Sequence, residues 1–278
     1  MNIISKYCAW LLLLFLLCGC EGLPKIEQIG LINEKANFTG GTVYNSIPAS
    51  ECRLPDYEKL SYDCKWLGLQ IGTFTTSIKG IEKFKDRDVY VLEATMKTNA
   101  FFSKVYKIED RFVSYLDAEK LYTLRHEVYR KEGNHKKEVV IDFDQINHKA
   151  YFKNNIDNSE GNYDIPEGVQ DVLSAYYFLT FLPMKIGDRV ELHINNNDRN
   201  YRFFGIIKSK VLIKLPKVGK KASEAFLLQP YATLDGKKVD KGMINAYYSS
   251  EKNRVLLFAK LKGAIFTEIS IYFSKKEN

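Results

Sequence analysis

The sequence predicts a mostly β protein, built as a curved antiparallel sheet that forms a sandwich or an open barrel, with one helix near residues 166–182. Most segments after residue 55 alternate polar and apolar side chains with a period of two, which indicates strands with one buried face. Turn-forming residues interrupt these segments at short intervals, as is typical of antiparallel hairpins. The 18 Tyr and 17 Phe favour the same class, because aromatic side chains suit half-buried pleated surfaces.

The first strand is expected at residues 59–66, where every second side chain is apolar or aromatic. Two glycines bracket the turn into the next strand, which is expected to end near Gly80. An Asp-Arg-Asp turn at 86–88 precedes a strand at 89–98. The predicted buried face of the first strand comprises Leu60, Tyr62, Cys64 and Trp66. Further strands are expected at 101–108, 112–116, 121–129, 138–143 and 150–153.

Residues 165–182 break the strand pattern, because their apolar residues recur at intervals of three and four. Pro166 suits a first helical turn, Asp164 is a candidate cap, and Pro183 ends the segment. We expect one helix, packed on the sheet or plugging it. Its predicted apolar stripe comprises Val169, Val172, Leu173, Tyr176 and Leu179.

The C-terminal part returns to strands. Segments 189–194 and 201–209 are expected to pair across the Asn-rich turn at 195–197. The clearest hairpin comes last, with alternating residues at 255–261 and 265–273. Two more strands are expected at 225–230 and 243–249.

The N-terminus carries the features of a secretory leader. Lys6 precedes a wholly apolar run at 9–17, which is too short to span a bilayer comfortably. Residues 17–20, LCGC, resemble the bacterial lipobox, which implies cleavage before Cys20 and acylation of its thiol and new amino group. Two or three acyl chains would anchor the protein firmly. The alternative is an ordinary secretory signal that releases a soluble periplasmic protein.

These features divide the chain into a signal peptide at 1–19, a lipidated N-terminus and tether at 20–55, and a single β-rich domain at 56–278. We therefore expect attachment to the periplasmic side of the cell envelope through a lipid anchor. Glu21 follows the acylated position, where an Asp would favour retention at the inner membrane, so the outer membrane is favoured over the inner.

Charge and cysteine content set limits on partners. Loss of Lys6 leaves 40 basic side chains against 34 acidic ones, a dispersed balance of +6. Its lysine pairs are interpreted as solvated turns, with anionic lipid headgroups or glycans as the alternative partners. Nucleic acid is not an expected partner of an exported protein. Cys52 and Cys64 are a candidate disulfide in an oxidising compartment, or else two separate thiols.

Motifs for chemistry are sparse. The four histidines do not form an HExxH pattern, and no GxSxG, GxGxxG or Walker sequence is present, so no metal or cofactor is expected. His126 and Glu127 are expected on opposite faces of one strand.

Two polar groups are candidate pocket residues. Around one strand, Arg111 and Asp117 lie with Asp110 and Ser114, either lining a cleft or serving as turn residues with a surface ion pair. On the predicted helix, Asp171 and Ser174 are three residues apart and therefore neighbours, and they line a polar pocket or serve the helix structurally. The helical candidates are Gln170, Asp171, Ser174 and Tyr177.

The body resembles domain-of-unknown-function family 3108 of exported proteins from bacteria with two membranes. The resemblance is collinear over 58–272, and its most specific stretch is PEGVQDVLSAYY at 166–177. It departs at 247–251, where the family tends to have a Trp and an acidic turn and this chain has YYSSE. Other matching stretches are EKLSY at 58–62, Trp66, Gly72, DVYVL at 88–92, Arg111 and SYLD at 114–117. The resemblance implies a curved, mostly antiparallel β fold and no known reaction.

We therefore expect a non-catalytic envelope lipoprotein that binds a hydrophobic or glycan ligand, or an envelope protein, with the helix as part of the wall. The alternative is a scaffolding module that acts through an exposed sheet face or edge. A hydrolase using Asp171 with Ser174 would require a cleft that holds both beside a histidine.

Overall fold

The computed structural model describes residues 28–31, 41–46, 54–215, 221–239, 242–252, 254–262 and 268–277. The predicted leader, Cys20 and Cys52 lie outside these ranges. Within them the chain is mostly strand, and the predicted curved sheet is confirmed. Among the described helices, none is long and apolar enough to cross a membrane.

The first half of the body is an antiparallel meander, in which each strand pairs with the next along the chain. It confirms most of the predicted strands and adds a last one, β10. The strands are β3 (Glu58–Trp66), β4 (Leu69–Phe84), β5 (Arg87–Thr98), β6 (Glu109–Asp117), β7 (Thr123–Glu132), β8 (His135–Asp144), β9 (Lys149–Asn154) and β10 (Glu160–Asp164).

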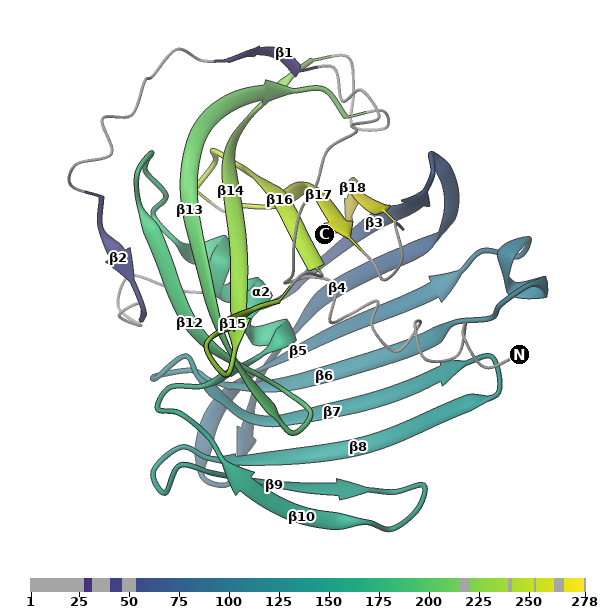
Figure 1. The fold of residues 1–278 in the computed structure, drawn as a ribbon, viewed down its shortest axis with the longest axis vertical. Coiled ribbons are helices and arrows are strands. Elements are labelled where there is room, and N and C mark those ends of the chain that lie inside the picture. The colour runs from purple at the N-terminus through teal and green to yellow at the C-terminus, as the bar shows by residue number, and fades with distance from the viewer. Residues whose placement is uncertain are drawn as a thin grey trace.

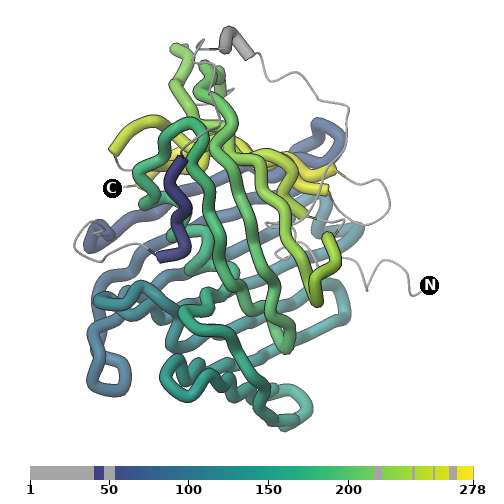
Figure 2. Tube along the Cα trace, turned by 60° about the vertical axis from the view of Figure 1, so that its left-hand side comes forward, coloured from purple at the N-terminus to yellow at the C-terminus, as the bar shows by residue number. Residues whose placement is uncertain are grey.

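The second half is a further antiparallel set, and its strands within 189–234 run steeply across the first half in both views (Figures 1 and 2). Its strands are β12 (Arg189–Asn196), β13 (Arg199–Ile213), β14 (Ser223–Leu234), β15 (Lys237–Lys238), β16 (Gly242–Ser249), β17 (Leu256–Lys262) and β18 (Glu268–Glu277). The predicted pairing of β12 with β13 is confirmed. Pairing of β18 with β3, with Ile271 opposite Cys64, joins the halves into one sheet.

Short strands complete the sheet. From the segment predicted as tether, β1 (Gln28–Leu31) pairs with β13, and β2 (Val43–Tyr44) runs parallel to β12. At the end of the first half, β10 pairs only with β9 among the described strands. Tyr163 of β10 donates a hydrogen bond to Asn195 Oδ1 of β12 at 3.0 Å, so a side chain bridges the two strands.

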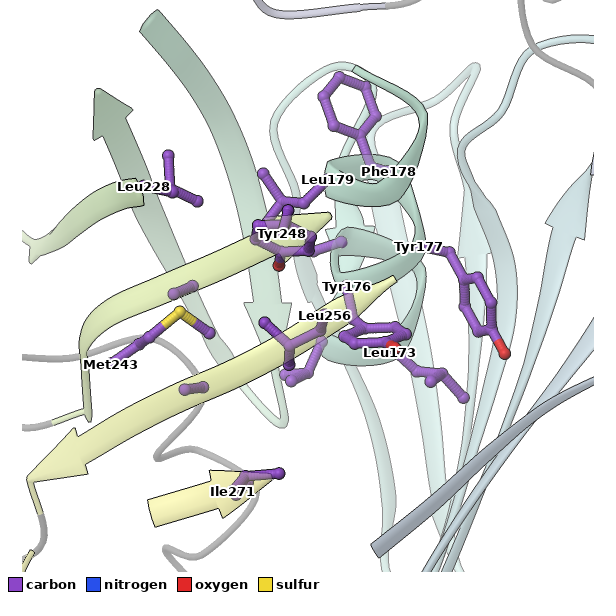
Figure 3. Packing of buried hydrophobic residues seen from close by; sticks show 14 of the residues in the cluster. Leu173, Tyr176, Tyr177, Phe178, Leu179, Leu228, Met243, Tyr248, Leu256 and Ile271 are labelled. Carbon is purple, nitrogen blue, oxygen red and sulfur yellow. The ribbon is translucent and has the colours of Figure 1, made fainter. Parts of the chain in front are cut away.

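The helix α2 (Val172–Phe181) plugs the space between the two halves. Nine of its ten residues are buried, so the prediction of a single apolar stripe is wrong. A helix enclosed on all sides has no polar face. In Figure 3, Tyr177 points toward one wall, while Tyr176 and Leu179 meet Tyr248 and Leu256 of the other.

The helix also starts later than predicted. Pro166 does not open it and Asp164 does not cap it. Instead β11 (Gln170–Asp171) pairs in parallel with β12, and Asp171 is the N-cap of α2. The pairing with Ile194 and Asn195 keeps the chain extended up to that point.

Three strand details also differ from the prediction. Residues 101–108 form a loop with a 3₁₀ turn at Phe102–Lys104, because Asn99 Oδ1 accepts the Phe102 N–H at 2.9 Å and starts a turn there. Gly80 lies inside β4 at an irregularity in register rather than at its end. Trp66, predicted on the buried face, is exposed, because it is the last residue of β3 and lies beside an exposed turn.

Candidate functional site

A group of buried polar side chains surrounds the N-terminus of α2. Asp171 is fully buried there, and the helix dipole and unpaired backbone N–H groups favour a carboxylate at this position. Two of its partners are hydroxyls from β6 and β7, so the carboxylate ties the helix to the first half. The four hydrogen bonds come from Ser114 Oγ (2.7 Å), Thr123 Oγ1 (2.7 Å), Leu173 N (2.7 Å) and Ser174 N (3.2 Å).

A histidine joins this group. His126 Nδ1 lies 3.2 Å from Ser114 Oγ and 3.4 Å from Asp171 Oδ1. Burial lowers the pKa of His126, although the nearby Asp171 carboxylate acts in the opposite direction. A Ser-His-Asp relay uses one ring nitrogen for the serine and the other for the carboxylate. Here both partners meet the same nitrogen, so the arrangement does not match a relay.

Space beside the helix is also limited. Two cavities lined by described residues flank α2 and measure about 10 Å³ each, which is near the minimum for a single water molecule. One lies against Tyr176 and Tyr248, and the other against His126 and Arg130. Among the described residues, the hydrogen bonds of Asp171 have the geometry of a helix anchor.

The other helical candidates are also held inside. Gln170 Nε2 donates to the Leu121 carbonyl at 2.7 Å, which fixes the strand before the helix. The Ser174 hydroxyl lies 2.7 Å from Thr123 Oγ1 and donates to the Asp171 carbonyl at 3.0 Å. Tyr177 is buried and packs edge-on against Tyr176, with ring centroids 5.1 Å apart. Burial raises the pKa of the Tyr177 hydroxyl.

The structure separates Arg111 and Asp117 from the helical candidates and from each other. Arg111 lies half-exposed on the outer face, where its Nε is 2.7 Å from Glu93 Oε2. Asp117 is buried at the other end of β6, where Oδ2 pairs with Arg87 at 3.0 Å. Its Oδ1 accepts the Glu119 and Lys120 N–H groups at 2.9 and 2.7 Å and so closes the turn to β7.

A second buried polar cluster contains Asp110, Arg130 and Glu132 at the ends of β6 and β7. Burial and the neighbouring Asp110 raise the pKa of Glu132 to about 8. Desolvation raises the pKa of Asp110 as well, although it accepts the Lys131 N–H at 3.1 Å. Nothing in the sequence marked Glu132, because its burial depends on the loop that covers it.

A wider opening than the cavities beside α2 lies on the outer face of β4 and β5, with a volume of about 370 Å³. We call it the hydroxyl groove. Its floor side chains alternate with core residues such as Phe74 and Ile78 and so face away from the helix. Small side chains next to long ones create the depression. The lining residues are Lys59, Thr73, Thr75, Ser77, Lys79, Glu93, Thr95, Lys97, Thr98 and Asn99.

Ion pairs set the charge of the hydroxyl groove. Glu93 binds Lys79 at 2.9 Å and Arg111 at 2.7 Å. Partial burial opposes ionisation of Glu93, but these two partners outweigh it and its pKa is lowered. Lys59 pairs with Glu277 at 2.5 Å, whereas Lys97 has no ion-pair partner among the residues described. Within the described part of the chain, the groove therefore presents hydroxyls and one cation, Lys97, without an ion-pair partner.

The sequence contained a signal for this groove. Thr73, Thr75 and Ser77 occupy every second position of one predicted strand, and Thr95 follows in the next. Only the observed register places Thr75 opposite Thr95 and Ser77 opposite Glu93. The sequence alone therefore does not show that these hydroxyls form one surface.

The cysteines and the possible metal ligands are the remaining features to compare with the prediction. Cys64 is buried on β3, and burial raises the pKa of its thiol to about 12. Its predicted partner Cys52 lies outside the described residues, so the disulfide stays a prediction. In the part of the chain that the structure covers, no three His, Cys, Asp or Glu side chains are placed to hold a metal.

Comparison with known proteins gives one family and a fold. The model of a family described as "Protein of unknown function (DUF3108)" matches residues 61–268. No curated protein matches the chain. A β-barrel-like protein of domain of unknown function DUF1849 from Brucella abortus is similar in structure, with a TM-score of 0.53 and 8% identity. The similarity covers 80% of this chain and 97% of that one, and it supports the curved β fold alone.

Two further structures are more distant. One is a presumed exported protein with a YmcC-like fold from Bacteroides fragilis, with a TM-score of 0.32, 7% identity and coverage of 80% of this chain and 95% of that one. The other is a presumed lipoprotein from Parabacteroides distasonis, with a TM-score of 0.32, 7% identity and coverage of 80% and 96%.

Proposed function

The chain belongs to the DUF3108 family of proteins of unknown function, and from that premise we propose that it is an envelope lipoprotein whose β domain binds an anionic glycan without reacting with it. The observation that carries this proposal is the hydroxyl groove. The proposal has two parts, a binding surface and a location, and each has its own support and its own test.

The size and chemistry of the hydroxyl groove fit a short oligosaccharide. Its volume of about 370 Å³ is within the range of small-ligand sites. Serine and threonine hydroxyls both donate and accept hydrogen bonds, as sugar hydroxyls do. Hydrogen bonds between the groove and a sugar can therefore replace the hydrogen bonds that each made to water. A polar floor of this kind does not suit an acyl chain.

The packed interior supports the polar ligand over the hydrophobic one. The two cavities of about 10 Å³ that described residues form beside α2 are too small for a lipid chain. A catalytic role for Asp171 and Ser174 has no support from geometry either, because both are fully committed to hydrogen bonds inside the core.

Charge favours an anionic glycan over a neutral one. Three lysines and one glutamate line the groove, and Glu93 already holds Lys79 and Arg111. The Lys97 ammonium group can therefore form an ion pair with a carboxylate or sulfate group of the sugar. Such a contact is screened by salt, so affinity should fall as ionic strength rises.

The envelope location is supported by the leader and the lipobox-like LCGC at 17–20. Acyl chains on Cys20 would hold the domain at the periplasmic face, with the outer membrane preferred because Glu21 is not the Asp of an inner-membrane protein.

The binding test uses a heparin tetrasaccharide as the anionic probe and chitotetraose as the neutral one, with binding measured by calorimetry. Thr75→Trp places a bulky ring on the groove floor and should weaken tetrasaccharide binding by about tenfold or more. Thr233→Trp is the matched control, because Thr233 is also a half-buried threonine beside core residues, on β14 and away from the groove.

We expect the control to bind the tetrasaccharide as the unaltered protein does, and Lys97→Gln to lose the preference for the anionic probe. Equal loss in Thr75→Trp and Thr233→Trp would contradict the proposal, as would binding of neither probe. Circular dichroism of each variant separates loss of binding from loss of fold.

The alternative scaffolding role has one supporting feature, the edge strand β10. It pairs only with β9 within the described chain, which leaves one side open to a partner strand. The strand has five residues, and Glu160 and Asp164 at its ends are both exposed, a pattern that discourages strand addition. This edge therefore supports the scaffolding role less well than the groove supports glycan binding.

A further inference from the structure

Exposed apolar side chains gather on two loops at one end of the first half. We call this surface the apolar rim and define it by Trp66, Leu67, Leu69, Phe101 and Val105. Leu67 lies in the β3–β4 turn, Trp66 and Leu69 are the strand residues on either side of that turn, and the other two lie in the β5–β6 loop. The exposed fractions are 38% for Trp66, 74% for Leu67, 62% for Leu69, 71% for Phe101 and 78% for Val105.

The two loops are joined, so the apolar rim is one surface. The Asn99 N–H donates to the Ile71 carbonyl at 2.9 Å, and Asn99 Nδ2 donates to the Gln70 carbonyl at 2.6 Å. The same asparagine also fixes the 3₁₀ turn that presents Phe101. Figure 1 shows both loops at the right-hand end of the first half. Single exposed apolar residues are common, but five on two tied loops form a patch that indicates an interaction.

Lysines surround the apolar rim. Lys65, Lys97, Lys104 and Lys107 lie on the same two loops or on the strand ends that carry them. Glu109 offsets part of this charge through ion pairs with Lys107 at 3.0 Å and Lys131 at 3.6 Å. Protruding apolar tips ringed by cations match an anionic bilayer surface, in which apolar side chains enter the headgroup region and ammonium groups meet phosphates.

We propose that the apolar rim inserts into the headgroup region of a bilayer that contains anionic phospholipid. Trp66 is suited to this position, because tryptophan concentrates at membrane interfaces. A protein partner is less well matched, because the apolar side chains project from narrow loop tips rather than forming a broad, flat face.

Insertion would also orient the hydroxyl groove. Lys97 and Asn99 line the groove and lie at the base of the β5–β6 loop that carries Phe101. The groove would therefore open beside the membrane surface. The insertion itself does not depend on glycan binding, so either proposal can fail alone.

The test uses residues 20–278 with Cys20→Ser, a chain that keeps every described residue and removes the predicted acylation. Of the two tryptophans in the sequence, Trp10 is in the leader, so Trp66 is the sole tryptophan of this chain. Vesicles of phosphatidylcholine with about one third phosphatidylglycerol should bind it and shift Trp66 emission to shorter wavelength. Vesicles of phosphatidylcholine alone should bind it less.

The variant Leu67→Ser/Phe101→Ser/Val105→Ser should reduce partition into the anionic vesicles by about tenfold or more. Ile146→Ser is the matched control, because Ile146 is 82% exposed on the β8–β9 turn, outside the rim, and should not alter partition. Lys104→Glu/Lys107→Glu should remove the preference for anionic lipid.

Three results would overturn the proposal: no Trp66 shift with anionic vesicles, equal losses in the rim variant and the Ile146→Ser control, or unchanged vesicle partition in the rim variant together with loss of a stoichiometric protein partner. The last result would assign the rim to a protein interface. Tetrasaccharide binding, measured on the same proteins, reports separately on the hydroxyl groove.

Discussion

Replacement of Asp171 by Ala tests the interpretation of the interior polar group as a helix anchor. Two backbone N–H groups and two hydroxyls lose their acceptor, and all four lie in the core. The Ser114 hydroxyl keeps His126 as a partner and the Thr123 hydroxyl keeps Ser174, whereas the N–H groups of residues 173 and 174 have no replacement. Each unsatisfied buried donor costs about 1–3 kcal/mol, so the two N–H groups together give an expected loss of about 2–6 kcal/mol in the free energy of unfolding.

Urea unfolding, followed by circular dichroism and by Trp66 emission in a chain without the leader, measures this loss. Asp171→Asn keeps one acceptor oxygen, so its free energy of unfolding should fall by less than that of Asp171→Ala. Asp157→Ala is the matched control, since Asp157 also accepts a backbone N–H and a hydroxyl, both from Ser159, but in an exposed turn. It should cost less than about 1 kcal/mol. Equal losses at the two positions, or a loss below about 1 kcal/mol for Asp171→Ala, would refute the anchor.

Two further predictions concern the second buried cluster and the membrane anchor. Burial raises the pKa of Glu132 from 4.5 to about 8, so between these values the folded state holds a proton that the unfolded state releases. Stability should therefore fall as pH rises through this window, by at most about 4 kcal/mol, and Glu132→Gln should remove that part of the fall in urea titrations at pH 5 and pH 8. The same pH dependence of the free energy of unfolding in the unaltered protein and in Glu132→Gln would contradict this prediction. Cys20→Ser in the full chain should abolish palmitate labelling and leave the leader attached, whereas Cys64→Ser should be acylated normally, and unchanged labelling of Cys20→Ser would exclude the lipoprotein assignment.

The strands were predictable because each one carries its own signal. Alternation at 89–98 and at 201–209 buries one face of a pleated strand, whatever its partner is. The loop at 101–108 was not predictable in the same way. Its Phe and Val residues suit a strand, but the Asn99 side chain caps a turn there and leaves Phe101 and Val105 in solvent.

The helix was predictable in existence but not in its limits or environment. Local signals at Pro166 favoured an early start, whereas β11 holds Gln170 and Asp171 extended beside β12. The choice of Asp171 as cap depends on Ser114 and Thr123, which are 57 and 48 residues away in the chain. No local pattern contains that information.

By itself, the sequence determined the class of fold, most of the strands and the presence of a helix before Pro183, because side-chain periodicity and turn chemistry are local properties. Tertiary structure alone decided where polar side chains meet. It placed Asp171 inside the core, sent Arg111 to the outer face, and brought Thr75 and Thr95 together as the floor of a groove. The physical reason is register, since a shift of one residue between paired strands would turn every one of these side chains to the other face.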